Sequence, residues 1–451
     1  MATTAPARPF STHLHALSSR NFLNGTGFTH HQESKIKIKT KNTTTLSLKS
    51  TSFQPIAALP FDLSPPPIDH DLLDTMKIAG AEVSENGIVE TFGNDDEALD
   101  AVENGVAVFA AVNTVVCMIS RQIRFSMIAA LMFVYIVKYG FNCLQVSGDD
   151  RIQFLHNQST ANFENLQEGQ GCDTVFITPT ARTIDIAHTW FMKNSIMLVV
   201  SPLTCGSISE MLNKFIFFAD KVEIQDITKQ TSLCILLGPK SNTVMSSLNL
   251  SDLVGQAYGT HRHYSVNGTP ITVAVGNVIS AEGFSLLMSP AIAGSIWRSL
   301  LSLGAIPMGS NAWERLRVIQ GRPAPGKELT NEFNVLEAGL WNSISLNKGC
   351  YKGQETISRL ITYDGVKQRL WGIRLSALVE PGSAITVDGK KVGKLTSYTS
   401  GRKESDHFGL GYIKKQVALG DTVIVGENIV GTVVEVPFLS QQHPPMKNRT
   451  P

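Results

Sequence analysis

The amino-acid sequence predicts an α+β protein that ends in a small all-β module. Between about residues 146 and 237, short strand-like runs alternate with helical segments, which is typical of antiparallel sheets that carry helices. From Gln368 onward, short strands are spaced by glycine and proline turns, which is typical of a small barrel. The chain has 451 residues, of which 43% are hydrophobic and 17% charged, so two or three domains with a sizeable core are expected.

The elements of the first two-thirds of the chain follow from hydrophobic periodicity and from turn residues. Gly105 is expected to be a helix C-cap, and Ser147 is expected to be the N-cap of the helix at 151–157. Segments 183–189 and 196–200 are expected to pair as a hairpin. The predicted helices are 71–80, 96–104, 151–157, 207–215, 290–303 and 311–319, and the other predicted strands are 87–92, 174–177, 221–226 and 232–237.

The C-terminal module is assigned to residues 367–437, and 438–451 is expected to be a tail. Its six strands are predicted at 370–375, 384–387, 391–395, 409–413, 422–425 and 431–436. Six short strands with tight turns favour a closed β-barrel.

The first 57 residues differ in composition from the rest. They hold seven basic residues and one acidic residue, with many serines and threonines, which is typical of an organellar transit peptide. The serine and threonine excess favours the chloroplast stroma, with the mitochondrial matrix as the alternative and a disordered cytosolic tail as a third interpretation. The remaining chain carries a net charge of −5, which argues against a nucleic-acid groove built on bulk charge.

The segment 109–144 is unusually apolar and interrupts the pattern with roughly 30 residues, long for a connection inside a compact domain. Its longest apolar run, 127–137, is short of the ~20 residues that span a bilayer, so no membrane span is predicted. Three interpretations remain open: a helix peculiar to this chain, an interfacial membrane anchor, and intron or mis-spliced sequence in the gene model. The third is preferred.

The most informative motif is Lys348-Gly349-Cys350-Tyr351-Lys352-Gly353-Gln354-Glu355. Two flanking lysines favour the thiolate form of Cys350, which makes the sulfur nucleophilic and easily oxidised. The six cysteines are scattered without a paired spacing, which favours free thiols in a reducing compartment, and no bound metal is predicted. The alternative is a glycine-rich turn with Cys350 as a small buried side chain.

This octet resembles the signature of the YgfZ-type folate-binding proteins, which are relatives of the glycine-cleavage aminomethyltransferase, or T-protein. The resemblance implies two α+β folate-binding subdomains around a central channel, within 58–366, followed by the small β-barrel. It further implies tetrahydrofolate as cofactor and a role in iron–sulfur cluster assembly or repair. The implied partners are folate and iron–sulfur assembly proteins or their client enzymes, with no direct nucleic-acid partner.

The resemblance also suggests which residues form the site. Asp185 matches the aspartate of the G-x-x-x-D strand, and Glu282 matches the glutamate of the T-G-E-x-G-F element, one residue short. Both carboxylates could accept pteridine N–H groups. Tyr351 could stack on a ring, and Gln354 could bind folate or fix the loop. Trp313 stands where the transferase has an arginine, which places aminomethyl transfer in doubt.

Three functions therefore compete. The first is a folate protein in which Cys350, activated by Lys348 and Lys352, performs thiolate chemistry beside the folate channel. The second is an aminomethyltransferase-like one-carbon transferase. The third is a non-catalytic, folate-sensing scaffold.

Overall fold

The computed structural model describes residues 70–85, 87–111, 140–266, 268–401 and 406–442. The predicted transit segment 1–57, the stretch 112–139 and the chain from residue 443 onward lie outside these residues. The ends of the predicted apolar segment are ordinary strand, because Phe109 lies in β3 and Leu144 lies in β4. Across the described ranges, no helix is both long and apolar enough to cross a bilayer.

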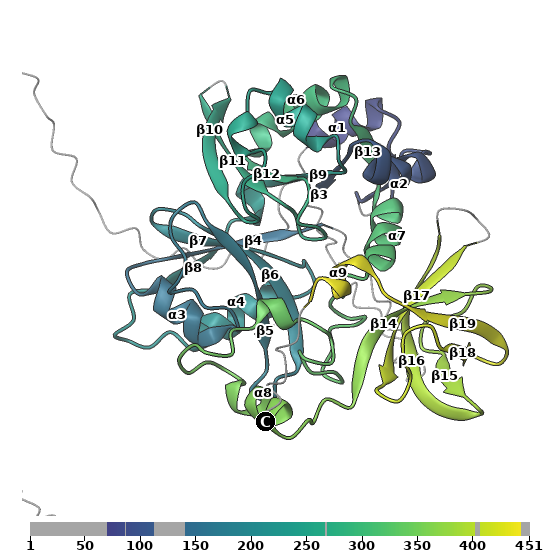
Figure 1. Cartoon of the computed structure of the whole chain (residues 1–451). Coiled ribbons are helices and arrows are strands. Elements are labelled where there is room, and N and C mark those ends of the chain that lie inside the picture. The colour runs from purple at the N-terminus through teal and green to yellow at the C-terminus, as the bar shows by residue number, and fades with distance from the viewer. Residues whose placement is uncertain (1–69, 86, 112–139, 267, 402–405, 443–451) are drawn as a thin grey trace, which may run out of the picture. The chain divides into compact units, whose positions relative to one another are not determined.

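A six-stranded sheet joins strands that are far apart in the chain (Figure 1). Its order is β10-β11-β12-β9-β3-β13, antiparallel except for the parallel pair of β13 and β3. The strands are β3 (Ala107–Ala111), β9 (Ser232–Leu237), β10 (His261–Val266), β11 (Thr269–Val275), β12 (Phe284–Met288) and β13 (Ile306–Met308). One face packs on α1 (His70–Ile78), α5 (Ser241–Ser247) and α6 (Pro290–Ser302), where Met76 and Trp297 are buried.

A five-stranded antiparallel sheet has the order β5-β6-β7-β4-β8. Its strands are β4 (Asn142–Ser147), β5 (Gly171–Ile177), β6 (Thr183–Phe191), β7 (Ser195–Val200) and β8 (Glu223–Asp226). One face is covered by α3 (Arg151–Gln158) and α4 (Cys205–Lys214), which bury Leu155 and Ile208. Trp190 and Met197 pack with Ile235 of β9 instead, so the two sheets share one apolar core.

The C-terminal module is a closed six-stranded barrel with the order β14-β17-β16-β15-β18-β19. Its strands are β14 (Gln368–Leu375), β15 (Ala384–Val387), β16 (Lys390–Ser400), β17 (His407–Lys414), β18 (Thr422–Val425) and β19 (Ile429–Val434). A separate core joins the barrel to the five-stranded sheet through the segment between α7 (Ser310–Gln320) and α8 (Gln354–Thr362). In that core the rings of Phe333 and Tyr412 stack at 3.5 Å between centroids.

The remaining short elements are β1 (Glu82–Val83), β2 (Val89–Thr91), α2 (Asp95–Asn104), η1 (Thr228–Gln230), η2 (Ser251–Leu253), η3 (Trp341–Ser343) and α9 (Pro437–Ser440). In the segment 438–442, which was expected to be part of a tail, Leu439 is buried and Asn342 bonds the Gln441 carbonyl.

The predicted α+β class with a C-terminal barrel is confirmed. Gly105 is the C-cap of α2, and its N–H donates to the Ala101 carbonyl, as expected. The N-cap expected at Ser147 is wrong, because Ser147 is still paired in β4 and Asp150 is the N-cap of α3. Gly148, at φ +104°, makes the turn between them.

Candidate functional site

The loop that carries Cys350 runs from η3 to α8 and leaves this cysteine exposed. Gly353 ends the loop in the left-handed region at φ +81°. A Cβ at this position would lie 2.6 Å from Ile177 Cδ1 and 2.9 Å from the Thr178 carbonyl oxygen. Glycine therefore allows the loop to close tightly on the β5–β6 turn while Cys350 stays in contact with solvent.

Lys348 anchors this loop to the end of α3. Its side chain is only 8% exposed, and its ammonium donates to the backbone carbonyls of His156, Ser159 and Ala161. The same ammonium lies 4.5 Å from the centroid of the Tyr351 ring. Burial lowers the pKa of Lys348 to about 7, while the three carbonyl oxygens favour the charged form. Lys348 thus holds the loop in place.

Lys352 lies on the other side of Cys350. Its ammonium sits 4.5 Å from the centroid of the Phe215 ring, and its backbone N–H donates to the Asn157 carbonyl. Burial lowers the pKa of Lys352. Within the described ranges, no hydrogen bond joins the ammonium of either lysine to the Cys350 sulfur. Activation of the thiol by these charges therefore stays a prediction.

His156 is a neighbour of this loop that the sequence analysis did not identify. The residue is 1% exposed, and its buried Nδ1 has no hydrogen-bond partner in the described part of the chain. Its Nε2 lies 3.9 Å from the place where Gly349 would carry a Cβ. Burial, and next the charge of Lys348, lower the pKa of His156. A histidine in the last turn of a helix gives no sequence signal that connects it with a loop almost 200 residues away.

Asp185 is buried in β6 and is fully hydrogen-bonded. Its Oδ1 accepts from the Ile186 N–H at 2.7 Å, and its Oδ2 accepts from the Ser201 N–H at 2.8 Å. The Thr204 hydroxyl donates to the same Oδ2 at 2.5 Å. Burial raises the pKa of Asp185, and the Thr204 hydrogen bond is the largest opposing effect. The carboxylate therefore fixes the start of α4.

The other predicted ligand-binding residues lie apart from Asp185. Glu282 is exposed in the turn between β11 and β12. Tyr351 is buried in the core between the five-stranded sheet and the barrel, and Gln354 is the half-buried first residue of α8. Of the seven predicted site residues, only Lys348 and Tyr351 share a side-chain contact within the part of the chain that the structure describes.

A buried polar cluster lies where β5 and β6 face the second sheet. Trp190 donates from Nε1 to His188 Nε2 at 2.8 Å. Because an indole nitrogen is only a donor, His188 Nε2 accepts and its proton is on Nδ1. This Nδ1 lies 2.8 Å from Asp173 Oδ1, which also accepts from the Tyr258 hydroxyl at 2.9 Å. The cluster is a connected chain of hydrogen bonds that ends on one carboxylate.

Register explains why this cluster was not predicted. Asp173 and His188 are 15 residues apart but lie directly opposite each other across β5 and β6. The sequence does show polar residues at alternating positions of two apolar strands. This pattern does not tell which residue faces which until the register of the two strands is known.

Arg322 follows the C-cap of α7 and lies near this cluster. The residue is 7% exposed, and its Nε is buried without a hydrogen-bond partner. Burial lowers the pKa of the Arg322 guanidinium, and the charges of Asp185 and Asp173 oppose that effect. Arg322 thus lies within electrostatic range of both carboxylates.

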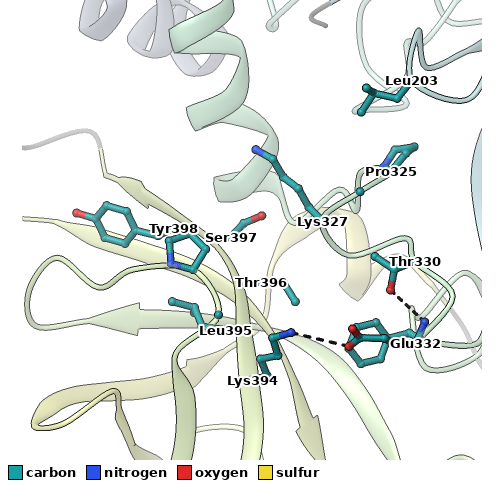
Figure 2. A pocket seen from close by; sticks show the side chains of 14 residues that line it. Leu203, Pro325, Lys327, Thr330, Glu332, Lys394, Leu395, Thr396, Ser397 and Tyr398 are labelled. Atoms are coloured by element: carbon teal, nitrogen blue, oxygen red, sulfur yellow. Dashed lines mark hydrogen bonds and ion pairs between the residues drawn. The ribbon is translucent and has the colours of Figure 1, made fainter. Parts of the chain in front are cut away.

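A pocket of about 470 Å³ opens between the segment that follows α7 and strand β16 of the barrel (Figure 2). Leu203, Phe333 and Leu395 supply apolar walls. Lys394 and Glu332 form an ion pair of 3.9 Å across the pocket, and both side chains are about half exposed. An exposed pair of this kind is weak, so it can exchange for a ligand carboxylate.

The pocket adjoins the buried carboxylate of β6. Leu203 in its wall precedes Thr204, which donates to Asp185. The Thr183 N–H, two residues before Asp185, donates to the carbonyl of the wall residue Phe333.

Trp313 is a core residue of α7. Its ring stacks on Phe109 at 4.3 Å and meets Phe141 edge-on. An aromatic side chain thus fills the position at which the resemblance implies a folate-site arginine. In the described ranges, no group of three or more histidine, cysteine, aspartate or glutamate side chains is placed to hold a metal ion.

Comparison with known proteins agrees with this architecture. The family model described as the GCVT N-terminal domain matches residues 139–348. The protein "Putative transferase At1g60990, chloroplastic" of Arabidopsis thaliana is 66% identical over 392 residues, which is 87% of this chain and 84% of that protein. An aminomethyltransferase of Rubrobacter xylanophilus is 28% identical over 64% of this chain and 79% of its own length.

A solved structure shows the same fold. The glycine cleavage system aminomethyltransferase T of Bartonella henselae superposes with a TM-score of 0.67 at 16% identity, covering 83% of this chain and 98% of that one. The two sheets and the closed barrel define an aminomethyltransferase-like α+β protein. With the 66% identical relative, this shows that the chain belongs to the GCVT family.

Proposed function

We propose that this protein is a tetrahydrofolate-binding member of the YgfZ-type branch of the family, located in the chloroplast stroma. The aminomethyltransferases among its relatives support folate, and the chloroplastic relative supports the plastid. In this proposal the protein assists assembly or repair of iron–sulfur clusters in client enzymes. The observation that carries it is the exposed thiol of Cys350 on a loop that Lys348 anchors through three hydrogen bonds.

The buried polar groups fit the pteridine of folate. A pteridine presents both N–H donors and a carbonyl acceptor, so it needs carboxylates and a cationic donor at its edge. Asp173 and Arg322 supply this combination, because the Arg322 Nε has no hydrogen-bond partner in the described ranges. Asp185 already accepts three hydrogen bonds, and its proposed contribution is negative charge near Arg322. Glu282 is proposed as a further acceptor of pteridine N–H groups on the resemblance alone, because its exposed β11–β12 turn lies apart from Asp185. When bound, tetrahydrofolate would supply a carrier for one-carbon units.

The residues of the chain have distinct proposed roles. Cys350 acts as the reactive thiolate at the surface, where a partner protein can reach it. Lys348 positions the loop, and the charge of Lys352 favours the thiolate. Tyr351 and Gln354 are the two ends of the turn that directly follows Cys350, since the Gln354 N–H donates to the Tyr351 carbonyl.

Replacing Cys350 with Ser tests the proposal. We expect the variant to lose the ability to restore iron–sulfur enzyme activity in chloroplasts that lack the protein, because a hydroxyl cannot replace the thiolate. Tetrahydrofolate should still raise its melting temperature, with about 2.7 kcal/mol of stabilisation at a ligand concentration 100 times the dissociation constant. Cys172→Ser is the matched control, because burial raises the pKa of the Cys172 thiol to about 12. Full restoration by the Cys350→Ser variant would refute the thiolate role.

Aminomethyl transfer to folate is the second candidate, favoured by the aminomethyltransferases that match the chain. The core position of Trp313 weighs against it. The discriminating assay is turnover of a lipoyl-bound aminomethyl substrate with tetrahydrofolate.

A further inference from the structure

The starting observation is a buried cation with unused hydrogen-bonding capacity. Arg322 is more than nine-tenths buried, yet its Nε has no acceptor among the residues that the structure describes. Burying a donor without an acceptor destabilises the folded state, and more strongly when the group is charged. By contrast, Arg317, the other buried arginine of this region, donates to Glu314, Glu328, Ser397 and the Arg322 carbonyl. A buried guanidinium that lacks such partners indicates a ligand acceptor.

The surrounding charges define what this acceptor is. Asp185 and Asp173 both lie within electrostatic range of Arg322, and so does the Arg317 guanidinium, so the two carboxylates already balance the two cations here. A ligand carboxylate would be a third negative charge beside Asp185 and Asp173, and these two carboxylates would repel it. A neutral carbonyl oxygen would accept from the guanidinium without that penalty.

The pocket between the segment that follows Arg322 and the barrel indicates the direction from which the ligand enters. Its wall residue Pro325 follows Arg322 by three residues, and its wall residue Leu203 adjoins Thr204, the hydrogen-bond partner of Asp185. Lys394 lines this pocket (Figure 2), half exposed and only weakly paired, whereas the ammonium of the other lining lysine, Lys327, is bonded to Glu314. An extended ligand with a neutral heterocycle at one end and carboxylates at the other would place its carboxylates near the Lys394 ammonium.

We propose that Arg322 donates to the C4 carbonyl oxygen of a 4-oxo-pteridine, and that the ligand's carboxylate end lies in the pocket toward Lys394. This inference rests on the proposed folate function and adds the group that selects the pteridine. Arg322 is then a specificity-determining residue, because a 4-amino group presents donors to the guanidinium and leaves the same cation unpaired.

Two ligands and two variants test the proposal. The full-length protein is titrated with tetrahydrofolate and with its 4-amino analogue, tetrahydroaminopterin, under anaerobic conditions. We expect the unaltered chain to bind the 4-oxo form at least about 10-fold more tightly, within the range of a charge-assisted hydrogen bond. Arg322→Met should weaken tetrahydrofolate binding by a similar factor and abolish the discrimination, and Arg322→Lys should restore part of it.

Arg298→Met is the matched control, because Arg298 bonds Thr75 at the contact of α1 and α6. It should bind both ligands like the unaltered chain. Equal affinity of the unaltered chain for the two ligands would overturn the role of Arg322 and leave the folate function standing. If a folded Arg322→Met variant still preferred tetrahydrofolate over the 4-amino analogue by the same factor, the role of Arg322 would also be overturned and the folate function would stand. Failure of the unaltered chain to bind either ligand would overturn the folate function itself.

Discussion

At the residue scale, two buried histidines make stability depend on pH. His156 and His261 are both at least 98% buried, and burial is the largest cause that lowers the pKa of each. His261 lies 3.2 Å from the Gly259 carbonyl through Nδ1 and 3.1 Å from the Phe191 carbonyl through Nε2. His156 lacks a partner at Nδ1. The folded state therefore disfavours the charged form of both rings.

Because the folded pKa values lie below the unfolded value of about 6.5, the unfolded chain binds more protons as pH falls through that value. We expect the contribution of these two histidines to the free energy of unfolding to be constant above about pH 7. It should decrease as the pH falls from about 6.5. Urea unfolding at several pH values measures this slope. His156→Gln should make the slope shallower, because it removes one of the two rings whose charged form the folded state disfavours. An identical slope in His156→Gln would contradict the assignment.

Residue roles were the part of the site least accessible to prediction. The Cys350 motif could be recognised because its eight residues are contiguous. The pair of Asp173 and His188 depends on strand register, and the position of Arg322 depends on how α7 ends against the two sheets. Local spacing carries neither kind of information. The same limit explains Asp185, whose carboxylate the structure uses to bond the start of α4.

At the element scale, the end of α3 and the Cys350 loop form one unit. The last carbonyls of a helix have no partner within the helix and carry partial negative charge. Lys348 satisfies the carbonyl of His156, in the last turn of α3, and those of Ser159 and Ala161 just beyond it. The Asn157 carbonyl accepts from the Lys352 backbone N–H.

Lys348→Met should therefore free the loop, because it leaves three carbonyl oxygens without their donor. We expect a loss of about 2–4 kcal/mol of stability, in line with unpartnered buried polar groups. Hydrogen exchange should also accelerate at the amide of Lys352. Lys352→Met is the control, because its side chain contacts a ring and its backbone bond remains, so it should cost less than about 1 kcal/mol. Equal losses in both variants would contradict the anchoring role.

At the scale of the whole described chain, the barrel strands were the easiest to predict. All six lie within a few residues of the predicted segments, because their hairpins are local and glycine turns mark the ends. Which strands share a sheet could not be predicted from local sequence patterns. The six-stranded sheet combines β3, β9 and β13, which are separated by more than 60 residues each, and no local pattern records that pairing.

A buried ion network connects α7, the segment that follows it and the barrel. Arg317 bonds Glu314 and the fully buried Glu328, and Glu328 also accepts from Ser397 of β16. Glu328→Gln should destabilise the chain by about 3–5 kcal/mol, the cost of removing one partner from a buried pair. Denaturant unfolding measures the loss, and hydrogen exchange should show greater opening in β16.

The exposed pair of Asp149 and Lys221 provides the comparison. Asp149→Asn should change stability far less than Glu328→Gln, as expected for a solvent-exposed ion pair. If Glu328→Gln cost no more than Asp149→Asn, the network would not connect the barrel to the rest of the described chain.

The hydrogen bond from Trp190 to His188 has a practical consequence. Indole emission responds to the polarity and charge around the ring, and this indole is directly bonded to the cluster in which we place the pteridine. The unlabelled protein thus carries its own optical reporter, and a change in its fluorescence would follow occupancy in real time.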